Sequence, residues 1–114
     1  MTPDQIETAT AEQQREVLEA AWRKLRGDEY VKTGVNHFYR FQAMLDAEAY
    51  LDAALMLLPE GWDYEISRAG PWSWATIWRV GQRDSTGIAI RQETTPALAL
   101  CAAILRAKET NDDA

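Results

Sequence analysis

The segment that most constrains the fold is an apolar run near the C-terminus, from Ala97 to Leu105. Thr95 and Pro96 precede it, which places a capping side chain and then a proline where a helix begins. A helix that is apolar around its whole circumference cannot rest only one stripe on a sheet. We therefore expect this helix to be packed between a sheet and another element.

Ahead of this helix, tryptophan recurs with the spacing of β-strands. Four of the chain's five tryptophans lie in this segment, at Trp62, Trp72, Trp74 and Trp78. Side chains two apart share one face of a strand, so the pattern predicts strands over 62–66 and 72–80, with a third over 86–92. Short links between them predict an antiparallel meander. We expect the tryptophan face to lie under the helix, with Trp74 and Trp78 in the core and Trp72, beside the turn at Gly70 and Pro71, at the surface.

The N-terminal half carries helical patterns. Thr10 and Gln13 have the spacing of a capping box, and apolar residues then recur every three or four positions until Gly27. A second helix is predicted to start at a cap on Asp46 and to end before Pro59. The segment 28–39 is ambiguous, and we expect a loop that aromatic residues pin to the body.

These elements predict an α+β fold in the order helix, helix, three-stranded antiparallel sheet, helix, layered as an α/β/α sandwich. A chain of 114 residues is long enough for one domain with its own core. We expect that domain over 10–108. Residues 1–9 are predicted to be a flexible arm, although Pro3 could start a short helical turn, and residues 109–114 a disordered acidic tail.

The net charge of −6 is unevenly distributed. Residues 46–67 hold six acids and no lysine or arginine, namely Asp46, Glu48, Asp52, Glu60, Asp63 and Glu65. Such a block repels phosphate, so direct nucleic-acid binding is not expected. The lone cysteine, the absence of a signal-peptide pattern and apolar runs too short for a bilayer predict a cytoplasmic protein without a membrane segment.

Two groups of residues could in principle carry chemistry. Cys101 and His37 could act as nucleophile and base, but a thiol inside an apolar helix behaves as a small hydrophobe. Asp63 and Glu65 could do acid–base work or bind a cation, although solvated carboxylates on an open sheet explain them equally well. One histidine and one cysteine cannot make a zinc site. We predict no catalytic, cofactor-binding or metal residues and no enzyme activity.

Two segments carry a resemblance to a known family. The run Leu51–Trp62, followed by three short strands and the run Thr95–Leu105, resembles the phage ABA-sandwich domain family over residues 46–108. The resemblance implies helix, sheet and helix layers, and a phage or prophage protein that acts inside a bacterial host. The resemblance implies no catalytic residues in this chain.

The resemblance and the charge pattern together suggest an accessory factor that binds a protein. The partner would be a host or phage protein with a basic groove, and inhibition of a host or defence complex, for example of the CRISPR type, is the leading hypothesis. A virion structural or assembly component is the alternative, and an enzyme is a third class. Neither the partner's identity nor the oligomeric state follows from the sequence. The expected contact residues are Glu48, Asp52, Glu60, Asp63, Glu65 and Trp72.

Overall fold

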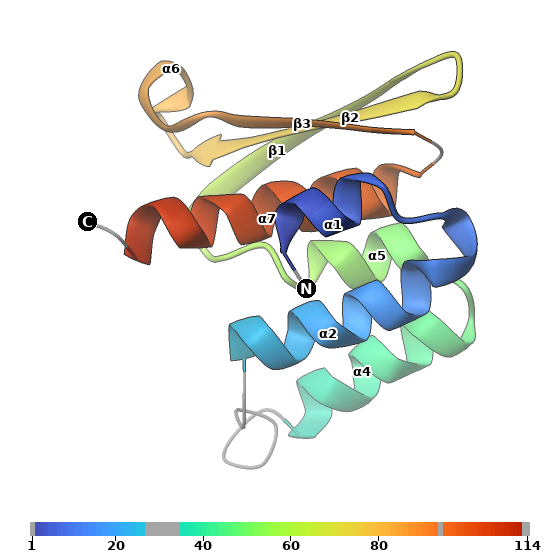
Figure 1. The fold of residues 1–114 in the computed structure, drawn as a ribbon. Helices are drawn as coiled ribbons and strands as arrows, with labels where there is room; N and C mark the ends of the chain where they lie inside the picture. The colour runs from blue at the N-terminus through green and yellow to red at the C-terminus, as the bar shows by residue number, and fades with distance from the viewer. Residues whose placement is uncertain (1, 27–34, 94, 113–114) are drawn as a thin grey trace.

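The computed structural model describes residues 2–26, 35–93 and 95–112 (Figure 1). Helices form the N-terminal half, an antiparallel sheet follows, and a long helix ends the chain, which confirms the predicted α+β class. In chain order the elements are α1 (Pro3–Glu7), η1 (Ala11–Gln13), α2 (Gln14–Arg26), α4 (Val35–Asp46), α5 (Tyr50–Leu55), β1 (Trp62–Ala69), β2 (Trp72–Arg79), α6 (Arg83–Thr86), β3 (Ile88–Glu93) and α7 (Pro96–Asp112).

The sheet is the predicted antiparallel meander, with strand order β1-β2-β3. A two-residue turn joins β1 to β2, because Ala69 pairs with Trp72 across Gly70 and Pro71. Gly70 has a φ of 59°, the positive value that a tight hairpin requires at its first central residue. The short helix α6 occupies the connection between β2 and β3, where only a short link is expected from the sequence.

Helix α7 is packed on all sides, as its composition predicts. Every residue from Ala97 to Leu105 is at most 2% exposed. The helix contacts the sheet on one side and α1, α2 and α5 on the other. Its start is capped as expected, since the Thr95 hydroxyl accepts the Leu98 N–H at 3.1 Å. Helix α7 is therefore the middle layer of the molecule (Figure 1).

The order of the layers differs from the predicted α/β/α sandwich. The helices, apart from α6 at one end of the sheet, lie on one side of it (Figure 1). The sheet is one outer layer, α7 with α1 is the next, and α2, α4 and α5 lie beyond them. A helix that is apolar all round needs cover on both sides. Here the sheet covers one side of α7 and the other helices cover the opposite side, so no helix is needed on the far face of the sheet.

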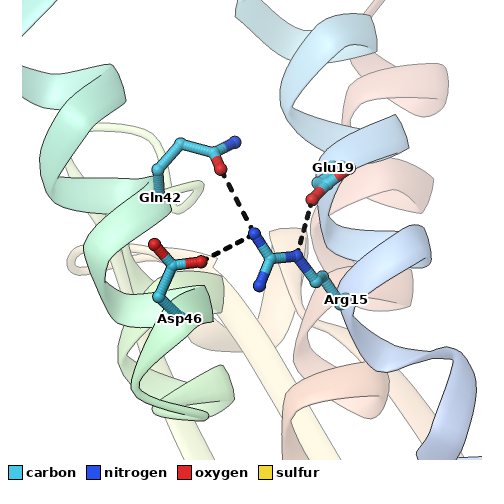
Figure 2. Close-up of polar contacts among 4 residues, drawn as sticks. All are labelled: Arg15, Glu19, Gln42 and Asp46. Atoms are coloured by element: carbon cyan, nitrogen blue, oxygen red, sulfur yellow. Dashed lines mark hydrogen bonds and ion pairs between the residues drawn. The ribbon is translucent and has the colours of Figure 1, made fainter.

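Helices α2 and α4 pack as a pair in the layer farthest from the sheet. Trp22 of α2 stacks on Phe41 of α4, with ring centroids 4.5 Å apart. At the edge of this contact, Arg15 of α2 pairs with Asp46 of α4 at 2.8 Å, and Figure 2 shows the same guanidinium reaching Glu19 and Gln42. The Asp46 hydrogen bond and then the Glu19 hydrogen bond raise the pKa of Arg15. The pair is exposed, so it orients the helices more than it stabilises them.

The predicted start of the second helix is wrong. Asp46 does not cap a helix there but is the last residue of α4, and α5 begins only at Tyr50. The segment predicted as a pinned loop contributes the first half of α4, from Val35 onward, whereas residues 27–34 lie outside the described part of the chain. Phe38, Phe41 and Leu45 recur at spacings of three and four, and burial of that stripe outweighs the weak helix propensity of Asn36.

Both ends of the chain also differ from the predicted domain limits. Residues 3–7, predicted to belong to a flexible arm, form α1, whose Ile6 is fully buried against the core. Its N-terminus is a capping box in which the Thr2 N–H donates to the Gln5 side chain at 2.8 Å. At the other end α7 continues to Asp112, so residues 109–112 are helical; residues 113 and 114 are outside the described chain.

The position of α7 makes two substitutions informative. Leu100→Ala and Ile104→Ala should each lower the free energy of unfolding by roughly 2 to 5 kcal/mol, because each leaves a cavity among residues that cannot fully close over it. Urea denaturation of the two variants measures this. A normal stability in either variant would show that α7 is covered on one side only.

Candidate functional site

The two faces of β2 differ sharply in exposure. Ser73, Ala75 and Ile77 are completely buried and face α7. The alternate residues Trp72, Thr76 and Trp78 are half-buried, and Trp74 is 39% exposed. Because alternate residues of a strand point to opposite faces, the tryptophans lie on the side of the sheet away from α7. We call this side the open face.

The strand register extends the open face onto β1 and β3. Asp63 lies opposite Trp78, and Glu65 lies opposite Thr76. At the other end small residues flank the indoles, since Ser67 lies opposite Trp74 and Ala69 opposite Trp72. The described members of the open face are Asp63, Glu65, Ser67, Ala69, Trp72, Trp74, Thr76, Trp78 and Ala89. This is a row of indoles with carboxylates along one end.

The prediction that the tryptophan face lies under the helix is wrong. Trp74 and Trp78, expected in the core, both lie on the open face with Trp72. The reason lies in the composition of α7, which contains several alanines. A helix of small residues can approach a strand closely when the facing strand residues are also small, as Ser73 and Ala75 are. Indoles in that layer would hold the helix and sheet apart.

One end of the open face already holds a guanidinium. The Arg83 guanidinium of α6 lies 4.3 Å from the centre of the Trp78 ring, and it pairs with the Glu65 carboxylate at 2.6 Å. An indole face and a carboxylate together provide a cation–π contact and a charge-assisted hydrogen bond. The chain thus shows which chemistry the open face accommodates, namely that of an arginine side chain.

The acidic block of the sequence is divided in space. Asp46 is paired with Arg15, and Glu65 with Arg83, so basic residues from other segments offset two of the acids. Asp63 remains on the open face, where its carboxylate accepts the Tyr64 N–H at 2.8 Å.

The other predicted contact residues lie away from the open face. Glu48 sits between α4 and α5 with a φ of 59°, and not on a helix as predicted. Asp52 lies in the first turn of α5, and Glu60 follows that helix in the turn before β1. All three are exposed. The structure therefore places Asp63, Glu65 and Trp72 on one face of the sheet, with the acids at one end and Trp72 at the other, whereas Glu48, Asp52 and Glu60 precede the sheet.

The structure does not support the other candidates for chemistry. Cys101 is completely buried, and burial raises the pKa of its thiol to about 12, which keeps it protonated and unreactive. His37 belongs to α4, but its side chain lies outside those described. Among the described residues, no three histidine, cysteine, aspartate or glutamate side chains are grouped to hold a metal ion. None of the described helices has the length and apolar composition that crossing a bilayer requires.

A second surface feature is a hollow between α2 and α4. Its volume is about 260 Å³, and it is lined by Glu19, Trp22, Arg23, Phe38, Phe41 and Gln42. Sites for small organic ligands are generally larger, about 300 to 1,000 Å³. The open face is thus a stronger candidate for a binding surface than this hollow. Comparisons with protein-family models, curated proteins and solved structures find no match to this chain.

The exposure difference among the tryptophans can be measured directly. A variant that keeps only Trp74, with phenylalanine at the other four positions, should be quenched by acrylamide much more strongly than one that keeps only Trp22. Trp74 is 39% exposed and Trp22 is 2% exposed. Equal protection of the two indoles would mean that something covers the open face.

Proposed function

We propose that this protein acts by binding another protein through the open face of its sheet, and that the partner presents a basic surface. The observation that carries the proposal is the row of indoles beside Asp63 and Glu65 on the side of the sheet opposite α7. Exposed aromatic side chains on a rigid sheet are preorganised for contact, because little conformational freedom is lost on binding.

Trp74 is the expected anchor of this contact. Tryptophan is among the residues that most often dominate the energy of an interface, particularly near its centre. Trp74 is the most exposed of the open-face indoles, and the small residue Ser67 lies beside it across the strand pair. A partner side chain can therefore reach its ring from the β1 side.

The acids determine which charge we expect on the partner's surface. Asp63 would attract arginine and lysine side chains, and the pairing of Arg83 with Glu65 and Trp78 illustrates the contact that such a side chain could make. The net charge of −6 would speed the encounter with a basic protein. Because screening shortens as salt rises, association should weaken with ionic strength.

The biological setting of the proposal comes from the resemblance to the phage ABA-sandwich domain family. In that setting the partner is a host or phage protein with a basic groove, and binding would inhibit a host or defence complex. An anionic surface that occupies such a groove would exclude nucleic acid from it, which requires no catalytic group on the inhibitor. This is the simplest mechanism that an acidic binding module offers.

Matched charge reversals test the proposal. One double variant carries Asp63→Lys and Glu65→Lys on the open face, and the other carries Glu48→Lys and Asp52→Lys near α5. Both change the net charge equally, so only their position differs. We expect the first pair and Trp74→Ala to reduce capture of partner from bacterial host lysate at least tenfold, whereas the second pair has little effect. Wild-type capture should fall as salt rises from about 0.05 to 0.5 M.

Tyr39→Ala is the control for loss of an exposed aromatic, since Tyr39 is 65% exposed but lies on α4. Circular dichroism confirms that each variant is folded. Equal losses in the two charge-reversal pairs would show that net charge alone governs capture and would refute a site on the open face. Recovery of phage structural proteins in place of a host complex would assign the protein to virion assembly.

A further inference from the structure

The outer edge of β1 is a second surface with a definite chemistry. β1 is an edge strand, because in the strand order β1-β2-β3 its sole neighbour among the described strands is β2. It is regular over eight residues, contains no proline, and six of the eight are exposed. The opposite edge differs, since α1 contacts β3. Long, regular edge strands offer a template for pairing with another strand.

The register identifies the backbone groups that point outward from this edge. The Val80 N–H donates to the Gly61 carbonyl at 3.0 Å, and hydrogen-bonded pairs alternate along an antiparallel ladder. The odd-numbered residues of β1 therefore bond to β2, and the even-numbered residues direct their N–H and C=O groups away from it. Two of those outward N–H groups are bonded within the chain, that of Trp62 to the Pro59 carbonyl and that of Tyr64 to the Asp63 carboxylate.

The free part of the edge is thus centred on Ile66 and Arg68. We propose that β1 pairs with β1 of a second copy of this chain, antiparallel and with Ile66 opposite Ile66, to form a symmetric dimer with a continuous six-stranded sheet. A two-fold axis at Ile66 makes the two strands exchange both backbone hydrogen bonds at that residue.

In this register the side chains of β1 in one copy complement those of β1 in the other. On the face toward α7, Tyr64 lies opposite Arg68 of the second copy, twice by symmetry. Tyr64 is 41% exposed in the monomer, and an arginine over an aromatic ring is a pairing that this sheet already uses, with Arg79 over Trp62 at 5.7 Å. On the open face, Glu65 lies opposite Ser67 and Asp63 opposite Ala69, so no like charges face each other.

The neighbouring register with Glu65 opposite Glu65 would oppose two carboxylates directly, which disfavours it.

Pairing at Tyr64 replaces the internal bond from its N–H to the Asp63 carboxylate with one to the Arg68 carbonyl of the second copy. The dimer would also join two open faces edge to edge, so each copy would contribute Ser67 and Ala69 beside the acids of the other. The inference uses the strand edge and does not depend on the proposed function.

The backbone contribution is tested with Arg68→Pro, because proline removes an N–H that points away from β2 and leaves the chain's own ladder intact. Arg68→Ala is the matched variant that loses the same side chain but keeps the N–H. Sedimentation equilibrium should give twice the mass of one chain for the wild type, a weaker dimer for Arg68→Ala, and a monomer for Arg68→Pro. A wild-type monomer at all concentrations, or a dimer unaffected by Arg68→Pro, would overturn the proposal.

The register is tested by mixing a Tyr64→Cys copy with an Arg68→Cys copy and oxidising with glutathione disulfide. Opposed residues of a hydrogen-bonded pair lie within disulfide range, so the mixture should form a covalent dimer, whereas either variant alone should cross-link at least tenfold less. Cys101 does not interfere because it is fully buried. Failure of the mixture to cross-link preferentially would contradict the Ile66-centred pairing.

Discussion

The close packing of α7 on one face of β2 is the contact on which the rest of the structure depends. Ala75 and Ile77 of the strand are fully buried against this helix. Within the helix, every residue from Ala97 to Leu105 is buried as well. Burying a leucine or isoleucine side chain contributes about 1.5 to 3 kcal/mol, so α7 supplies a large share of the stability of a small domain. Because Ser73 and Ala75 are small, the strand and the helix approach closely, and no indole fits between them. The indoles of β2 lie on the open face as a result, and a packing requirement thereby creates the candidate binding surface.

The sequence predicts those features that depend on period and composition. The run Ala97–Leu105 required burial on all sides, and the alternation from Trp62 onward required strands; both predictions are confirmed. Period alone cannot say which face of a strand is covered. The interpretation that large aromatics belong in the core chose the wrong face, whereas matching small strand residues such as Ala75 to an alanine-rich helix would have chosen correctly.

Local signals were overridden in two helices. Asn36 has a weak helix propensity, but Phe38 and Phe41 complete the aromatic contact with Trp22, and tertiary burial decides the structure of α4. Asp46 has the chemistry of a helix cap, yet it ends α4 and pairs with Arg15, a partner that no local pattern reveals. Of the predicted contact acids only Asp63 and Glu65 adjoin the indoles, because Glu48, Asp52 and Glu60 precede the sheet in the chain.

Two neighbouring substitutions test most directly which face of β2 lies under α7. Ala75→Ile adds bulk to the face against α7, and Thr76→Ile adds a residue of the same shape to the open face. Urea denaturation should show that Ala75→Ile lowers the free energy of unfolding by about 1 to 3 kcal/mol or more through overpacking, while Thr76→Ile changes it by no more than about 0.5 kcal/mol. A larger loss for Thr76→Ile than for Ala75→Ile would place α7 over the tryptophans and contradict the open face.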